Sequence, residues 1–210
     1  MSTAREYPRM QPRMHAQRRF LAAKLARVRE PHVAPISALA DQIAVDSGLD
    51  PGMVPYPDPD GAGIEARVLF LLDNPGPRAR AGSGSGLISM DNDDPTAERV
   101  WRANQRFGID RARVLYWNIV PFPTEGMNST TSEMRRAAPY TKQLLGMLPK
   151  VERVVLLGRK AEQGWRIAGL STPLPPLVGP HPSNRGINAV KGNEALFVDV
   201  MQRVAGIVSA

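Results

Sequence analysis

Residues 67–76 read Arg-Val-Leu-Phe-Leu-Leu-Asp-Asn-Pro-Gly, and this stretch decides the fold. The unbroken apolar run Val68–Leu72 is typical of a strand that is buried on both faces of a sheet. The Asp-Asn-Pro-Gly that follows ends the strand, because these residue types favour turns. The stretch therefore predicts a central strand that delivers polar side chains to one edge of a sheet.

Three further apolar runs have the length of strands, namely Val114–Asn118, Val151–Leu157 and Leu174–Val178. Helical patterns are predicted over residues 37–47, 95–107, 132–148, 159–165 and 194–207. Strands that alternate with helices form parallel sheets with helices on both faces. We therefore expect a single α/β domain, residues 31–210, with three layers (αβα) and a short four-stranded parallel sheet, preceded by an N-terminal helical arm over residues 1–30.

The net charge of +7 is concentrated in the first 29 residues, which hold eight of the 27 basic residues and one acidic residue, Glu6. A helix is predicted within this arm, over residues 14–30. The arm has three interpretations: a segment that binds a polyanion such as nucleic acid, a solvated tail, or an organelle transit peptide.

The composition also excludes several classes of protein. The chain has no cysteine, which excludes disulfides, cysteine-based zinc sites and cysteine-ligated iron–sulfur clusters. No apolar run approaches the roughly 20 residues that cross a bilayer, so no membrane partner is expected. We expect a cytoplasmic monomer, associated with the nucleoid if the source is bacterial.

The candidate functional residues are polar side chains that follow the predicted strands, because ligands of parallel sheets bind beyond the carboxyl ends of the strands. Asp73 and Asn74 follow the first strand, and Asn118 ends the second. His181 and Ser183 come shortly after the fourth. Each residue alone fits a turn, a strand-end cap or a structural histidine, but together they predict a polar site at one edge of the sheet.

From about His32 to the C-terminus, the sequence resembles the uracil-DNA glycosylase superfamily. That superfamily has a strand followed by a turn ending in Pro-Gly or Pro-Tyr, here Leu72–Gly76, although Leu72 replaces the usual glycine. A middle strand ends in an asparagine that reads uracil, here Asn118. The last motif is His-Pro-Ser followed by a residue that wedges into the duplex, here His181–Arg185, with Asn184 in place of the usual proline.

The Asn-Pro-Gly ending is similar to the single-strand-selective and mismatch-specific branches, in which the asparagine positions the attacking water. Asn74 is the matching residue. Asp73 instead matches the glutamate of the iron–sulfur branch, a branch that the lack of cysteine excludes. Either Asn74 or Asp73 is therefore expected to handle the water. Arg185 at the wedge position is again similar to the single-strand-selective branch.

The resemblance implies a chemistry in which the target base leaves the stack and enters a pocket. The amide of Asn118 has a donor and an acceptor, which fits the O4 and N3–H edge of uracil and rejects cytosine. His181 is expected to stabilise the charge that develops on uracil O2. Pro75 and Gly76 are expected to line the substrate site, and backbone N–H groups around them to contact flanking phosphates.

We therefore expect a monofunctional DNA glycosylase that hydrolyses the N-glycosidic bond of flipped-out uracil, or another deaminated base, as the first step of base excision repair. Its partner is uracil-containing DNA, and its product is abasic-site DNA, because no lysine among the motifs offers an amine for strand cleavage. Ser183 and Arg185 are expected to contact the DNA. No cofactor and no metal ion are required.

Two alternatives remain open. The first is a relative that binds damaged DNA or other nucleic acid with little glycosylase activity, since the superfamily's base-stacking phenylalanine would fall near Ile88–Met90, where there is none. The second is a nucleotide-processing enzyme that uses Gly82–Gly86 as a phosphate loop. That loop lacks the Lys-Ser or Lys-Thr of a P-loop.

Three groups of residues are expected to have no catalytic part. Asp91, Asp93 and Asp94 predict a solvated loop in which Asp94 caps the next helix. Trp117 and Phe122 are expected in the core. His15 and His32 are interpreted as incidental.

Overall fold

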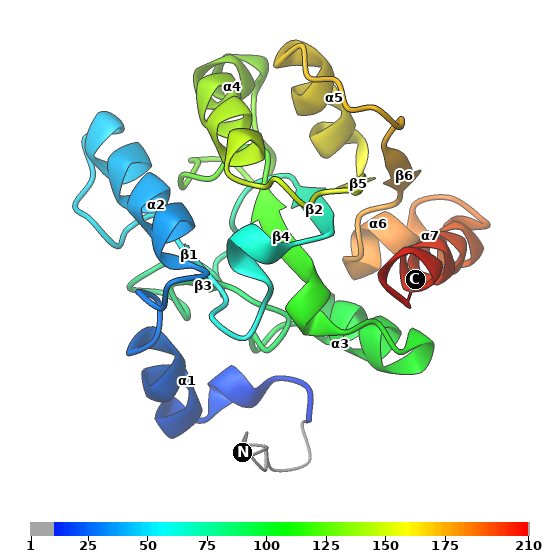
Figure 1. The fold of residues 1–210 in the computed structure, drawn as a ribbon, viewed down its shortest axis with the longest axis horizontal. Coiled ribbons are helices and arrows are strands. Elements are labelled where there is room, and N and C mark those ends of the chain that lie inside the picture. The colour runs from blue at the N-terminus through cyan, green and yellow to red at the C-terminus, as the bar shows by residue number, and fades with distance from the viewer. Residues whose placement is uncertain (1–10, 210) are drawn as a thin grey trace.

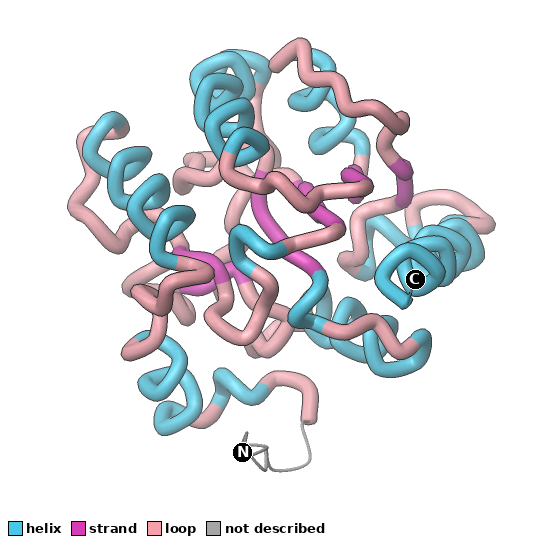
Figure 2. Tube along the Cα trace, in the orientation of Figure 1, coloured by secondary structure: helices cyan, strands magenta, loops and turns pink. Residues whose placement is uncertain are grey.

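A parallel four-stranded sheet lies at the centre of the computed structural model, which describes residues 11–209 (Figure 1). Its strands are β2 (Val68–Leu72), β4 (Val114–Asn118), β5 (Arg153–Leu157) and β6 (Leu177–Gly179), in the spatial order β4-β2-β5-β6. Figure 2 shows these strands enclosed by helices. The expected α/β class and the four parallel strands are confirmed.

Helices cover both faces of the sheet, so the expected three layers are present. One face carries α2 (Ala34–Asp46), α4 (Thr131–Gly146) and α5 (Arg159–Ile167). The other face carries α3 (Pro95–Phe107), α6 (Asn184–Asn188) and α7 (Asn193–Ser209).

The strand β2 contributes to both hydrophobic clusters, because successive side chains of a strand point to opposite faces. Leu69 and Leu71 pack with α2, α4 and α5, whereas Val68 and Phe70 pack with α7. All four side chains are fully buried. Trp117 is also in the core, as predicted.

Local signals set the ends of α3 as the sequence predicts. The Asp94 carboxylate accepts hydrogen bonds from the backbone N–H groups of Thr96 and Ala97, at 2.8 and 2.9 Å. Pro95 occupies the first turn, where its missing N–H costs nothing. Gly108 ends the helix at φ 64°, a left-handed conformation that glycine adopts without strain.

One prediction of secondary structure is wrong, and some short elements were not predicted. The single helix over residues 14–30 is instead a 3-10 helix (Met14–Ala16) and α1 (Arg18–Leu25), because the extended backbone of Gln17 separates them. A two-stranded parallel sheet, β1 (Tyr56–Pro57) with β3 (Leu87–Ile88), forms where the sequence analysis predicted no strand. The helix α6 follows His-Pro-Ser. These elements are too short for a periodic pattern to predict them.

The expectation of a solvated acidic loop is wrong for Asp91, which is 2% exposed. Lys24 of α1 reaches its carboxylate at 2.5 Å, and Arg111 reaches it at 2.9 Å. The same lysine contacts Asp58 at 2.8 Å and Asp60 at 3.1 Å. These opposite charges allow the carboxylates to be buried, because each carboxylate has a cation beside it. We call these five residues the ionic cluster.

The basic N-terminal arm is therefore joined to the domain by charge pairs over the part that the structure describes. Arg13 pairs with Glu98 at 2.7 Å, and Arg29 pairs with Asp41 at 2.6 Å. The arm's first ten residues, with Arg5 and Arg9, lie outside the described residues.

Replacing Lys24 with methionine should lower the free energy of unfolding by about 3–5 kcal/mol, because the buried carboxylates of Asp58 and Asp91 and the partly buried carboxylate of Asp60 would lose the ammonium they surround. Urea denaturation measures this change. Lys150→Met is the matched control, because its exposed pair with Glu65 should contribute less than about 1 kcal/mol. Equal effects of the two substitutions would contradict the stabilising part assigned to the ionic cluster.

Candidate active site

The register of the sheet aligns the carboxyl ends of all four strands. Leu72 lies opposite Asn118, and Leu157 lies opposite Gly179. The N–H of Val120 donates to the Asp73 carbonyl at 3.1 Å, which continues the pairing beyond the strands. The predicted site residues of three separate motifs therefore lie along one edge of the sheet.

Asn118 ends β4 and presents a buried acceptor. Its side chain is 5% exposed, and its Oδ1 has no hydrogen-bond partner among the described residues. A buried oxygen without a partner costs roughly 1–3 kcal/mol, and most such groups in proteins are paired. This cost is recovered when a ligand brings an N–H or O–H donor to Asn118.

His181 is held in one tautomer by its own loop. The backbone N–H of Ser183 donates to His181 Nδ1 at 3.2 Å, so the neutral ring carries its proton on Nε2. Burial lowers the pKa of His181, and the negative charges of Asp73 and Asp94 oppose this shift. The site therefore holds a neutral imidazole that can donate a hydrogen bond from Nε2 at neutral pH.

Two glycines allow the backbone to approach His181 closely. A Cβ atom on Gly158, the residue after β5, would lie 2.9 Å from the His181 Cβ. Gly158 also has φ 101°, which side chains rarely tolerate. A Cβ atom on Gly186 would overlap the His181 carbonyl group. The position of His181 therefore depends on β5 and α6 as well as on β6.

Asp73 is buried and already engaged. Its carboxylate accepts hydrogen bonds from the Ser129 hydroxyl and from the Ser129 backbone N–H, the latter at 3.3 Å. Lys160 Nζ donates to the Ser129 carbonyl at 2.8 Å. These bonds tie the end of β2 to the segment before α4. Neither Ser129 nor Lys160 was predicted from the sequence, because both are distant from Asp73 along the chain.

Asn74 is only partly buried, and its amide orientation is set by Thr124. Asn74 Nδ2 donates to Thr124 Oγ1, which in turn donates to the Gly126 carbonyl at 2.9 Å. With Nδ2 occupied, Asn74 Oδ1 remains as an acceptor. Pro75 is buried beside it, and its carbonyl accepts a hydrogen bond from Arg80 Nε at 2.9 Å, whereas Gly76 is exposed.

The last motif forms the short helix α6. The Ser183 hydroxyl accepts a hydrogen bond from the Gly186 N–H at 3.1 Å and so caps this helix. Arg185 is exposed on α6, and the structure shows no ion pair for it within residues 11–209. Arg99 of α3 supports the motif by donating to the Pro182 carbonyl at 2.7 Å. No motif or spacing in the sequence pointed to Arg99.

Where the superfamily's aromatic residue is missing, the structure places aliphatic side chains. Ile88 belongs to β3, and Met90 is 6% exposed. Phe122, which flanks the base-reading motif, is 1% exposed, with the Arg136 guanidinium 4.0 Å from its ring centre. Phe122 is therefore a core residue, as the sequence predicted.

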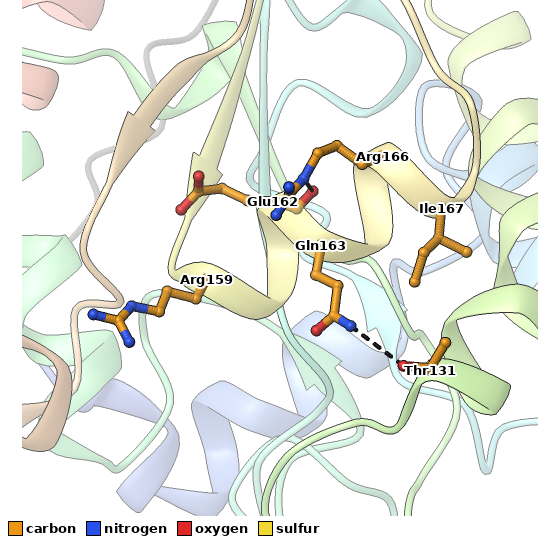
Figure 3. A pocket seen from close by; sticks show the side chains of 6 residues that line it. All are labelled: Thr131, Arg159, Glu162, Gln163, Arg166 and Ile167. Atoms are coloured by element: carbon orange, nitrogen blue, oxygen red, sulfur yellow. Dashed lines mark hydrogen bonds between the residues drawn. The ribbon is translucent and has the colours of Figure 1, made fainter.

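A hollow of about 590 Å³ lies beside the sheet edge, between the start of α4 and one face of α5 (Figure 3). It is lined by Thr131, Arg159, Glu162, Gln163, Arg166 and Ile167. Gln163 donates to the Thr131 hydroxyl at 3.3 Å across it. None of the candidate residues lines this hollow, so it flanks the site and is not the site itself.

A parallel sheet that gathers amide, imidazole and carboxylate groups at its strand ends defines an α/β protein with a polar site for a ligand. The family model for the uracil DNA glycosylase superfamily matches residues 59–205, and the chain belongs to this superfamily. Its function is accordingly of the DNA glycosylase type, with DNA as the substrate. A comparison with curated proteins found no match.

Residues 11–209 contain neither a candidate membrane span nor a candidate metal site. No helix in this range has the length and apolar character required to span a membrane. No three histidine or acidic side chains within it are arranged to hold a metal ion.

NMR titration should give His181 a pKa below the ordinary 6.5, with the neutral ring protonated at Nε2. Because folding lowers the pKa of His181, the contribution of this residue to the free energy of unfolding is fully present above pH 6.5. It is lost as the pH falls through the folded-state pKa. Asp73→Asn should lower this pKa further, because it removes a charge that favours the protonated ring. A His181 pKa above 6.5, or Nδ1 protonation of the neutral ring, would contradict the geometry described.

Proposed function

We propose that the protein is a monofunctional uracil-DNA glycosylase, which hydrolyses the N-glycosidic bond of a flipped-out uracil and leaves an abasic site. The observation that carries the proposal is the buried Oδ1 of Asn118, which has no hydrogen-bond partner within residues 11–209. It lies at the same sheet edge as the Nε2–H of His181, which supplies a donor. An acceptor and a donor placed in this way match the edge of uracil.

Asn118 accounts for the choice of base. Its Oδ1 accepts a hydrogen bond from uracil N3–H, and its Nδ2 donates to uracil O4. Cytosine has an acceptor at N3 and a donor at N4. Its acceptor would therefore face the acceptor Oδ1 of Asn118, and its donor would face the donor Nδ2. The buried amide would then stay unpaired at a cost of roughly 1–3 kcal/mol, which discriminates against the wrong base.

His181 accounts for the leaving group. Breaking the glycosidic bond moves negative charge onto uracil O2, and a fixed donor at that atom stabilises the transition state. The neutral imidazole donates from Nε2 while the Ser183 N–H holds Nδ1. No proton has to leave the histidine for this stabilisation.

Asn74 and Asp73 have the two remaining roles, which are to hold the attacking water and to stabilise the sugar. Asn74 Oδ1 is the acceptor that holds the attacking water, because Thr124 has already fixed the amide. Asp73 is engaged by Ser129, so it acts through its negative charge, which stabilises the positive character of the sugar. Pro75 and Gly76 follow directly in the same turn, where Pro75 is buried and Gly76 is exposed, so the Gly76 backbone is accessible to a substrate.

Ser183 and Arg185 contact the DNA in this proposal. The Ser183 oxygen accepts from Gly186, which leaves its O–H free to donate to a phosphate oxygen. Arg185 is exposed on α6, two residues after Ser183, where it can fill the gap left by the flipped base.

The proposal is tested by incubating the protein with an oligonucleotide that carries one uracil, followed by alkali to cleave abasic sites. Strand breaks should require alkali. His181→Ala should slow base release about 10²- to 10³-fold. Asn118→Ala should slow it by at least tenfold, because two hydrogen bonds to the base are lost.

Two control variants separate chemistry from folding. Asn104→Ala removes a buried asparagine that bonds Tyr116, and His32→Ala removes a histidine that bonds the Pro59 carbonyl; both should keep normal rates. The contrary result is a protein that binds damaged DNA but releases no base from either single- or double-stranded substrate. That result would refute the proposed glycosylase activity and favour the alternative of a relative that only binds damaged DNA.

A further inference from the structure

His15, which the sequence analysis interpreted as incidental, is buried and bonded at two points. Its side chain is 8% exposed, and its Nδ1 lies 2.8 Å from Asn92 Oδ1. Its backbone N–H donates to the Asp91 carbonyl at 3.0 Å. The interpretation was wrong because these partners are more than 70 residues away along the chain.

The direction of the hydrogen bond at His15 follows from its neighbours. Asn92 Nδ2 donates to the Leu87 carbonyl at 2.9 Å, which fixes the orientation of the Asn92 amide. Asn92 Oδ1 then accepts from the Ser85 hydroxyl at 2.6 Å. Since an amide oxygen only accepts, His15 Nδ1 is the donor. The ring is neutral, and its buried Nε2 has no partner among the described residues.

Ser85 continues the connection into the loop that follows Asn74. The Ser85 N–H donates to the Arg78 carbonyl at 2.9 Å, and the Gly84 N–H donates to the Arg80 carbonyl at 2.8 Å. A Cβ atom on Gly84 would overlap the Arg78 backbone, so the two sides of the loop are in close contact. Arg80 Nε then donates to the Pro75 carbonyl at 2.9 Å.

These bonds form one continuous path from the N-terminal arm to the turn beyond β2. We propose that His15 is a positioning residue, which acts through Asn92 and Ser85 to hold residues 76–92 and thereby sets the position of Asn74. Its effect on catalysis rests on the proposed function, but its effect on the loop does not. The arm is then a support of the active site.

The ionic cluster explains why this support stays in place. Lys24 anchors α1 to Asp91, the residue next to Asn92, at 2.5 Å. The arm is therefore attached both to Asn92, which accepts the His15 hydrogen bond, and to Asp91 beside it. Burial of His15 and the nearby charge of Lys24 both lower the His15 pKa, which keeps Nδ1–H as the only proton on the ring.

The test compares His15→Ala with His15→Asn in the full-length protein. The asparagine variant is conservative, because its Nδ2 can donate from near the position of Nδ1. Arg13→Ala is the matched control, because Arg13 lies in the same segment but its side chain, among the described residues, makes surface ion pairs with Asp93 and Glu98 and has no hydrogen bond to Asn92. Hydrogen exchange of the Gly84 and Ser85 amides and single-turnover base release at saturating DNA are measured together.

His15→Ala should speed exchange of both amides at least about tenfold and slow base release roughly ten- to hundredfold, since small misplacements of a catalytic group are costly. The dissociation constant for DNA should stay within about twofold. His15→Asn should restore most of the rate, and Arg13→Ala should behave like the wild type. Unchanged exchange in His15→Ala, or an asparagine variant as slow as the alanine variant, would overturn the proposal.

Ser85→Ala provides an independent variant in case His15→Ala folds poorly. If both residues act on one path, the double variant should be no slower than the slower single variant. If the double variant is instead slowed by the product of the two single effects, the proposal is overturned. If the wild type releases no base, the proposed function fails, and exchange of Gly84 and Ser85 still decides whether His15 holds the loop.

Discussion

The structure depends on the parallel pairing of β2 with β4 and β5. Because β2 is buried on both faces, a slip of its register by one residue would move the side chains of Val68 and Phe70 to the hydrophobic cluster on the opposite face of the sheet. That register places Leu72 opposite Asn118. The polar residues that follow β2 and β4 therefore meet at one edge of the sheet.

The site also shows how the cost of buried polar groups is distributed. Asp73 is satisfied by Ser129, and His181 Nδ1 is satisfied by the Ser183 N–H. Asn118 Oδ1 has no such partner among the described residues. Satisfied groups are fixed in place before a substrate arrives, whereas the unsatisfied acceptor is the group that gains most when a donor binds. The account of base recognition rests on this difference.

The sequence predicted the elements whose signals are local. The run Val114–Asn118 is a strand with the predicted bounds, and α3 has its predicted cap and glycine end. Contacts between distant segments carry no periodic pattern and were not predicted. His15 bonds Asn92 across 77 residues, and Ser129 bonds Asp73 across 56. The strand ends were therefore found from the sequence, but the residues that hold them were not.

The most direct measurement compares release of uracil with release of N3-methyluracil, which lacks the donor at N3, by the wild type and by Asn118→Ala. If Asn118 Oδ1 accepts the N3–H, the wild type should prefer uracil by at least about tenfold, the value of one hydrogen bond to a buried acceptor. Asn118→Ala should lose most of this preference. Equal release of both bases by the wild type, or an undiminished preference in the variant, would contradict the account.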